Sequence, residues 1–208
     1  MMGIPKRFTL CILTCSLVFC LFAGTALSAD FSKGDVKRMS TFLSNFTELG
    51  MYAFTTATLT RDELIAFGIR HNDANNQSRI ASCTIKDCPY GSLTIDAAYV
   101  TESIKKYFDV DFKDHASVKP TFTYFAEYLY YFDGRRYHFS GADGDMPYYA
   151  RVEEAAKNAA GQVVMKGTLY DADDESDIYG RFEAVAKPHK FNGKNTWAIV
   201  SMKTEKQE

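Results

Sequence analysis

The stretch YGRFEAVAKPHKFNGKNTWAIVSMKT, from Tyr179 to Thr204, places two alternating segments on either side of Asn192-Gly193. A tight hairpin turn needs positive φ at both central residues, and Asn-Gly supplies this at little steric cost. The alternation of apolar and polar residues on both sides is typical of half-buried strands. We therefore predict an antiparallel pair over residues 179–190 and 195–204.

The same pattern continues towards the N-terminus as far as Pro120. Asp133-Gly134 lies between Phe132 and Arg135 and predicts a second two-residue turn, and residues 158–161 predict a longer one. Sequential hairpins of this kind form an antiparallel meander. The predicted strands cover residues 121–132, 135–141, 147–157, 162–171, 179–190 and 195–204.

The preceding part of the chain has helical periodicity. Thr60 and Glu63 form a capping box before the second helix, and Gly50 suits the end of the first. We predict helices over residues 35–49, 61–75 and 96–108, each with one apolar stripe. Together, the elements predict an α+β fold with three N-terminal helices packed on a curved, about six-stranded antiparallel meander sheet.

The first 29 residues have the features of a secretory signal peptide. Lys6 and Arg7 precede an uncharged apolar run over residues 8–22, and small residues follow up to Ala29. We expect cleavage after Ala29, which leaves a single α+β domain over residues 30–208, with helices over about 35–108 and the sheet over about 121–204. The predicted location is the periplasm or the extracellular space of a bacterium.

Signal removal also changes the charge of the chain. Loss of Lys6 and Arg7 takes the formal net charge from −2 to −4. No basic patch is visible in the remaining sequence, which argues against nucleic acid and against an anionic membrane as partners. We expect no membrane association after signal cleavage.

Two cysteines remain after cleavage, Cys83 and Cys88, with four residues between them. A redox pair usually has two intervening residues, and two thiolates alone do not fill a zinc site. In an exported chain this spacing favours one local disulfide bond. We therefore predict a Cys83–Cys88 disulfide, with a redox pair or a metal clip as the alternatives.

Polar residues replace apolar ones near the end of the second predicted helix. The apolar rows of this helix lead into His71, Asn72 and Asn75. Buried polar groups must find hydrogen-bond partners, so the cluster is either the wall of a pocket or a structural polar knot. As a pocket wall, His71 would be an acid, base or ligand. These three residues are the candidate catalytic group, and the structural interpretation is favoured.

Carboxylates alternate in one predicted loop, at Asp171, Asp173, Glu175 and Asp177. Calcium loops use this spacing, but Ser176 replaces the required glycine and Phe182 replaces the bidentate glutamate. We expect a solvated loop here, and the sequence predicts neither a metal ion nor a cofactor.

Aromatic residues are dense over residues 122–149. Strand alternation places some of them on the core face and turns others to the outside, where tyrosine suits a binding surface. The alternative is that aromatic residues simply favour strands. The candidate binding residues are Tyr124, Tyr128, Tyr130 and Tyr131.

Two resemblances extend this interpretation. The order of helices and sheet, with the ending Thr196-Trp197-Ala198-Ile199-Val200-Ser201-Met202, resembles cystatin-like and nuclear-transport-factor-like domains, a topology that hosts both enzymes and binders. The segments over 42–46 and 71–72 and the tyrosine-rich hairpin are similar to small uncharacterised secreted bacterial proteins. That resemblance implies no catalytic residues, and fold likeness alone does not supply function.

The sequence favours an exported, soluble, non-catalytic protein that binds a protein, a glycan or a small ligand. One alternative is a small enzyme with a pocket between helices and sheet and His71 as general base. The other is an inhibitor-like protein that acts on a secreted enzyme through a hairpin loop.

Overall fold

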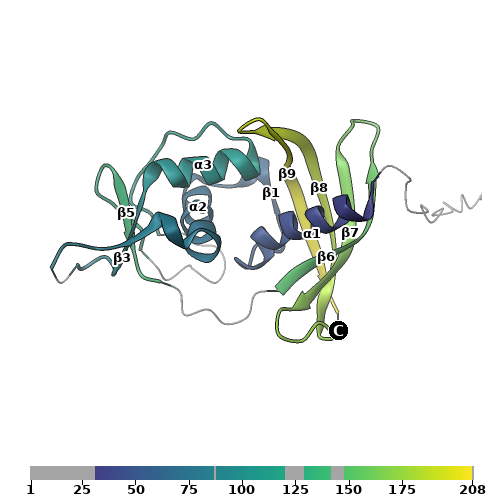
Figure 1. The fold of residues 1–208 in the computed structure, drawn as a ribbon, viewed down its shortest axis with the longest axis horizontal. Coiled ribbons are helices and arrows are strands. Elements are labelled where there is room, and N and C mark those ends of the chain that lie inside the picture. The colour runs from purple at the N-terminus through teal and green to yellow at the C-terminus, as the bar shows by residue number, and fades with distance from the viewer. Residues whose placement is uncertain (1–30, 87, 120–128, 142–147, 208) are drawn as a thin grey trace, which may run out of the picture.

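The computed structural model describes residues 31–86, 88–119, 129–141 and 148–207. Over these residues the chain has an α+β fold with three α-helices and two antiparallel sheets (Figure 1). The α+β class and the three helices are confirmed. The expected signal peptide, Tyr124 and Tyr128 lie outside the described residues.

The helices lie within two residues of their predicted positions. The predicted capping box of Thr60 with Glu63 forms, and a second one forms at Ser32 with Asp35, so that capping fixes where the first two helices begin. The third helix ends where Asp109 adopts the left-handed conformation. The bounds are α1 (Lys33–Thr47), α2 (Arg61–Asn75) and α3 (Ala97–Phe108), with short 3-10 turns η1 (Thr56–Thr58) and η2 (Gln77–Arg79).

The larger sheet has five strands in the order β1-β9-β8-β7-β6. Its longest strands meet at the predicted tight turn, where Asn192 and Gly193 have φ values of 49° and 75°. Four of the predicted strands therefore form this sheet, joined by one short strand from the first half of the chain. The bounds are β1 (Phe54–Thr55), β6 (Tyr148–Lys157), β7 (Val163–Asp171), β8 (Ile178–Phe191) and β9 (Lys194–Lys206).

The expectation of a single meander sheet is wrong, because a second sheet of four strands forms in the order β2-β3-β5-β4. Strand β5 pairs with β3, which precedes α3, and not with the following strand β6. Strands β2 and β3 have only three and four residues, which are too few for a pattern of apolar and polar residues to mark a strand, so the partner of β5 could not be recognised in the sequence. The bounds are β2 (Ile80–Ser82), β3 (Leu93–Asp96), β4 (Tyr131–Phe132) and β5 (Arg136–Phe139).

The turn between β4 and β5 differs by one residue from the prediction. Asp133 N–H donates to the Arg136 carbonyl at 3.0 Å, so the central residues are Gly134, with φ of 98°, and Arg135. Asp133 is thus the first residue of the turn. Its side chain accepts hydrogen bonds from the backbone N–H groups of Arg135 and Arg136.

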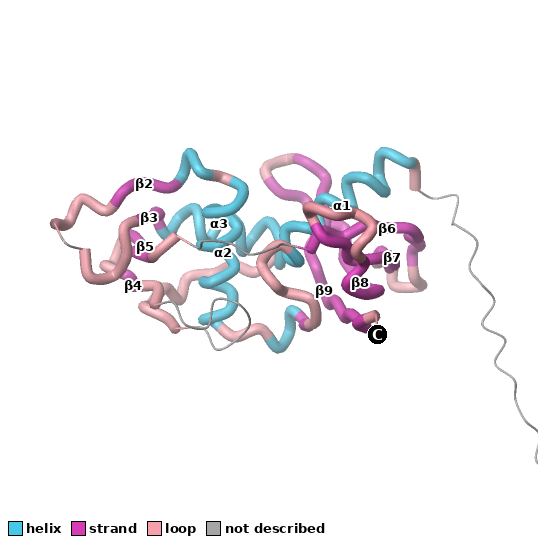
Figure 2. The backbone as a smooth tube through the Cα atoms, turned by 90° about the horizontal axis from the view of Figure 1, so that it is seen from below, coloured by secondary structure: helices cyan, strands magenta, loops and turns pink. Residues whose placement is uncertain are grey.

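Helices α2 and α3 lie between the two sheets, and α1 crosses the five-stranded sheet (Figures 1 and 2). The buried apolar residues form one cluster that includes side chains of both sheets and all three helices. Phe46 of α1 is fully buried, and its ring contacts those of Phe67, Tyr107 and Phe108. This aromatic contact joins the three helices in one core.

Close approach of α2 to α3 depends on Gly68. A Cβ atom at this position would lie 2.6 Å from Cγ1 and 3.0 Å from the carbonyl oxygen of Val100. One turn later, Asn72 donates to the Ser103 hydroxyl at 2.9 Å. Glycine thus brings the helices together, and a buried amide fixes their register.

Two serines of α1 bond to the edge strand of the larger sheet. The backbone N–H groups of Ala150 and Val152 in β6 donate to the hydroxyls of Ser44 and Ser40 at 3.1 Å and 3.0 Å. Residues four apart on a helix lie one turn apart, and this spacing matches alternate residues of a strand. The helix therefore occupies backbone donors that an edge strand otherwise leaves open.

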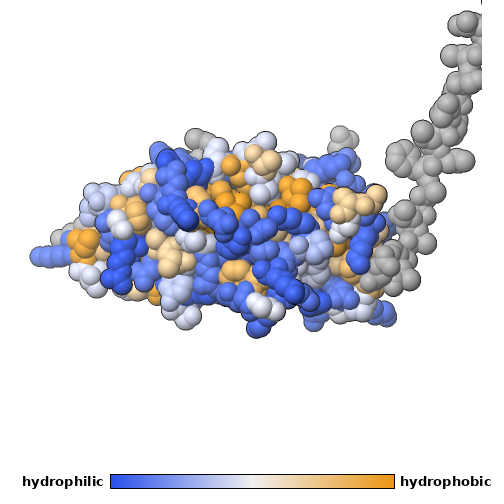
Figure 3. Space-filling view, turned by 90° about the horizontal axis from the view of Figure 1, so that it is seen from above, coloured by the Kyte–Doolittle hydropathy of each residue, from blue (hydrophilic) through white to orange (hydrophobic). Residues whose placement is uncertain are grey.

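Hydrophilic residues cover most of the face seen from above, and hydrophobic residues lie between them in smaller patches (Figure 3). The large apolar side chains that are exposed in the described part of the chain are Ile85, Tyr99 and Leu129. None of the helices described here is long and apolar enough to span a membrane.

Candidate functional site

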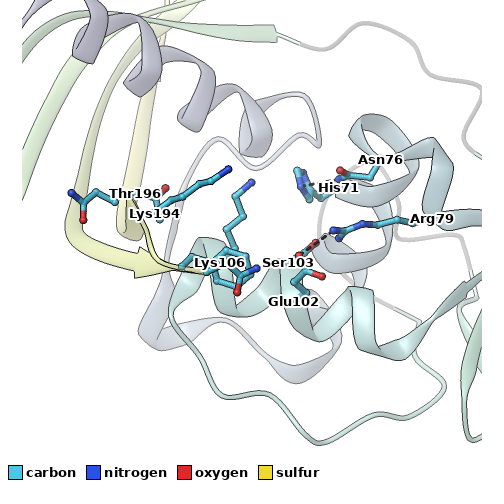
Figure 4. Close-up of a pocket in the computed structure, with 11 residues that line it drawn as sticks. His71, Asn76, Arg79, Glu102, Ser103, Lys106, Lys194 and Thr196 are labelled. Atoms are coloured by element: carbon cyan, nitrogen blue, oxygen red, sulfur yellow. Dashed lines mark hydrogen bonds and ion pairs between the residues drawn. The ribbon is translucent and has the colours of Figure 1, made fainter.

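A pocket of about 350 Å³ lies between α2, α3 and the turn that joins β8 to β9. This volume is in the range that small-molecule sites occupy. Figure 4 shows Lys106 of α3 and Lys194 of the β8–β9 hairpin extending into the same space, which His71 of α2 faces. The lining residues are His71, Asn76, Arg79, Glu102, Ser103, Lys106, Phe191, Asn192, Lys194, Asn195 and Thr196.

Positive charge exceeds negative charge in this pocket. Arg79, Lys106 and Lys194 supply three cationic side chains, and Glu102 is the one acid among the lining residues. That carboxylate is already paired with Arg79 at 3.0 Å. The pocket therefore carries an excess of positive charge that points to an anionic ligand.

Arg79 is held in place by three contacts. Besides its ion pair, its guanidinium donates to the Asn72 side-chain oxygen at 3.2 Å and lies 4.7 Å from the centre of the Tyr99 ring. A fixed planar guanidinium binds carboxylate or phosphate with little loss of conformational freedom. Arg79 is thus preorganised for an anion.

His71 forms one wall of the pocket and is 3% exposed. Its ring stacks on Phe67 and meets the edge of Tyr107. Burial, with repulsion from Lys106 and Arg79, lowers the pKa of His71 to about 3. The ring is therefore neutral near pH 7, with one nitrogen as donor and the other as acceptor.

The two asparagines predicted beside His71 have structural partners. Asn72 is fully buried and donates to the carbonyl oxygen of Gly68 at 2.7 Å as well as to Ser103. The Asn75 amide bonds to the Glu48 carboxylate and lies 3.5 Å from the Nδ1 atom of His71. The two alternatives for this cluster therefore apply to different residues: His71 borders a pocket, and Asn72 belongs to a structural polar knot.

Of the four candidate binding tyrosines, Tyr130 and Tyr131 are among the described residues. Tyr130 is fully buried, and its hydroxyl accepts from Arg70 Nε at 2.7 Å. Tyr131 is partly exposed, and its ring stacks on Tyr90 with the centroids 3.8 Å apart. One of the two described tyrosines of the prediction is therefore in the core and inaccessible to a partner.

The acidic loop between β7 and β8 is organised by its own backbone. Asp171 accepts from the N–H groups of Asp173 and Asp174, and Glu175 pairs with Arg151. Over the described residues, the groups of three or more potential metal ligands within 4.8 Å do not include this loop. Residues 173–177 are exposed to solvent.

Cys83 and Cys88 are free cysteines in the structure, with their sulfur atoms 2.7 Å apart, so the predicted disulfide bond is not formed. His138 of β5 lies beside both thiols, at 3.4 Å and 3.6 Å from Nδ1 to the two sulfur atoms. The cysteines therefore belong to a three-residue cluster with a histidine, which spacing along the chain did not indicate.

The cationic pocket residues were missed in the sequence for a simple reason. Arg79, Lys106 and Lys194 are far apart along the chain, and each looks like an ordinary surface charge. The lowered pKa of Lys106, caused mainly by burial with repulsion from Arg79, depends on the fold. Only the hairpin turn, which does carry a sequence signal, could have indicated that Lys194 lies at an end of the sheet.

Comparisons with protein-family models, with curated proteins and with solved structures find no match for this chain.

Proposed function

We propose that this protein is an exported binding protein that holds a small organic anion, with a carboxylate or phosphate group, in the pocket between α2, α3 and the β8–β9 turn. The observation that carries the proposal is the convergence of Arg79, Lys106 and Lys194 around one paired acid. Binding without catalysis is the function that this arrangement supports best.

The electrostatics of the free pocket favour an anion. Lys106 is partly buried, and its pKa is lowered by that burial and by Arg79, so its charge lacks full solvation. A bound anion compensates this charge and relieves the repulsion between the two cations. Hydrogen-bonding groups on Asn76, Asn195 and Thr196 are available to orient the rest of the ligand.

The enzyme alternative has weaker support. A general base works best when its pKa lies near the working pH, whereas the pKa of His71 is about 3. Asn72, a second member of the candidate catalytic group, is fully buried and bonded to Gly68 and Ser103. A neutral His71 suits a hydrogen bond to a ligand better than it suits proton abstraction.

Export is proposed from the sequence of residues 1–29. The protein isolated from the producing cell should begin at Asp30, which N-terminal sequencing or the intact mass reports. Fractionation of the culture then distinguishes periplasm from medium. A chain that keeps Met1 and remains inside the cell would contradict the proposed export.

Calorimetric titration with citrate, inorganic phosphate and sulfate tests the binding proposal, with glucose as the uncharged comparison. We expect heat with at least one anion, none with glucose, and weaker binding as salt increases. Lys106→Met and Lys194→Met should each weaken that binding by about tenfold, which corresponds to about 1.4 kcal/mol.

The matched control is Lys166→Met, which removes an equal charge from β7, where Lys166 pairs with Glu183 outside the pocket. This variant should bind as the unchanged protein does. If all three variants lost the same affinity for the anion, the net charge of the protein would explain the binding and the pocket would not be needed. Undiminished binding by Lys106→Met would refute the assignment of the pocket.

A further inference from the structure

A second site lies away from the pocket, where Cys83 and Cys88 meet His138. The three potential ligand atoms, two sulfurs and one imidazole nitrogen, all lie within 4.8 Å of one another. His138 belongs to β5 and pairs with Thr94 of β3, and Cys83 directly follows β2. The smaller sheet thus places His138 beside Cys83 and Cys88, which are 55 and 50 residues earlier in the chain.

The distances around His138 match those of a tetrahedral zinc centre. Bonds of about 2.3 Å to sulfur and about 2.05 Å to nitrogen place a sulfur and a nitrogen ligand about 3.6 Å apart. The observed separations from Nδ1 are 3.4 Å to Cys83 and 3.6 Å to Cys88. The two sulfurs, now 2.7 Å apart, would separate to about 3.8 Å around a shared ion.

The histidine is oriented as a ligand. Its Nε2 atom lies 3.0 Å from Oδ2 of Asp133, and the ring is almost fully buried. When Nε2–H donates to this carboxylate, the lone pair of Nδ1 points at the two sulfurs. A carboxylate behind a ligating histidine is the usual outer partner in zinc sites, because it fixes the tautomer and the ring orientation.

Asp133 is itself fixed by the turn that it begins. Its Oδ1 atom accepts from the backbone N–H groups of Arg135 at 2.8 Å and Arg136 at 2.6 Å. The other carboxylate oxygen is left for His138. The whole chain of contacts, from turn to carboxylate to imidazole to thiols, is therefore made by described residues.

The backbone of the cysteine-bearing loop is also held against β5. At Gly91, φ is 120°, and a Cβ atom would lie 2.1 Å from the carbonyl carbon of Phe139. Cys83 N–H donates to the Ser92 carbonyl at 2.8 Å. Only glycine permits this approach, which places the loop beside the neighbour of His138.

We propose that Cys83, Cys88 and His138 form a Cys2His site for a zinc ion, with Asp133 as the positioning residue. A disulfide bond would leave unexplained a buried imidazole that faces both sulfurs with a carboxylate behind it. Thiolate and imidazole ligands suit zinc better than magnesium or calcium. Three protein ligands leave the fourth position of the tetrahedron for water or another small ligand. The site is independent of the anion pocket.

The first experiment measures the metal content and thiol state of the protein purified without added reductant or chelator. We expect about one equivalent of zinc and, after a chelator removes it, two reactive thiols. Replacement by Co²⁺ should give sulfur-to-cobalt charge-transfer absorption and tetrahedral d–d bands. These readouts need no variant, so they remain valid if a substitution prevents folding.

Variants then assign the ligands. His138→Ala, Cys83→Ser and Cys88→Ser should each lose the cobalt spectrum, and Asp133→Asn should weaken zinc binding about 10- to 100-fold. His189→Ala is the matched control, because it removes a buried histidine of the other sheet and should bind zinc normally.

Two results would overturn the proposal. One is an intact mass that shows a Cys83–Cys88 disulfide in the protein as isolated, with no zinc present. The other is failure of the reduced, chelator-treated protein to bind Zn²⁺ or Co²⁺. Alkylation of Cys88 that proceeds equally fast with and without added Zn²⁺ would also count against it, since a bound thiolate is protected.

Discussion

Replacing the ring of His71 by a group that does not titrate should remove a defined part of the pH dependence of stability. The pKa of His71 is lowered to about 3 in the folded protein, mainly by burial and further by Lys106 and Arg79. In the unfolded chain it returns to about 6.5. The unfolded state therefore binds a proton that the folded state does not, and stability falls as the pH drops below about 6.5.

The magnitude follows from this difference. Between pH 7 and pH 5, protonation of this histidine stabilises the unfolded state by a factor of about 25, which corresponds to about 2 kcal/mol. The folded state binds almost no proton at His71 over that interval, because a pKa of about 3 lies well below pH 5. The loss continues as the pH approaches 3.

The assay is urea unfolding of the unchanged protein and of His71→Gln at pH 7 and at pH 5. The quantity compared is the change in unfolding free energy between the two pH values, so a uniform loss of stability in the variant cancels. Acidic groups, and the other histidines, are common to both proteins. We expect the unchanged protein to lose about 2 kcal/mol more than the variant. Equal losses would refute a buried, neutral His71.

Three further predictions concern the packing of the helices. Gly68→Ala should cost about 1–3 kcal/mol by thermal or urea unfolding, because the new methyl group meets Val100; an unchanged midpoint would contradict the close approach of α2 and α3. Ser40→Ala with Ser44→Ala should cost about 1–3 kcal/mol for each donor left without a partner in β6, and faster amide exchange at Ala150 and Val152 would identify the cause. Phe46→Ala should cost about 3–5 kcal/mol, since its ring is fully buried among those of all three helices, and a loss below 1 kcal/mol would argue against that core.

Local signals predicted the local elements well. The helix α2 occupies residues 61–75 as expected, because Thr60 and Glu63 mark its start in the sequence itself. The Asn192-Gly193 turn likewise fixed the β8–β9 hairpin. In both cases the structure is determined by interactions between residues that are close together in the sequence.

Long-range pairing could not be predicted in the same way. The partner of β5 is β3, whose four residues Leu-Thr-Ile-Asp alternate over too short a stretch to mark a strand and run directly into α3, so the sequence predicts one sheet where the structure has two. The dependence on long-range contacts also explains which site residues could be found from the sequence. His71 was found through the polar end of its helix, whereas its neighbours Lys106 and Lys194, and the link between His138 and the cysteines, depend on contacts across the fold.

The contact between α1 and β6 also bears on the order in which the chain folds. The serines of α1 and the strand donors that they satisfy are 106 and 112 residues apart. A helix of 15 residues is only marginally stable in water by itself, so α1 depends on tertiary contacts, and its contacts with β6 can form only after a long further stretch of chain has been synthesised. Long separations of this kind slow folding, because a large loop must close first. A chain that ends before residue 148 can still make the contacts of Phe46 with α2 and α3 but lacks β6, so we expect the amide hydrogens of α1 to exchange faster in it than in the full chain.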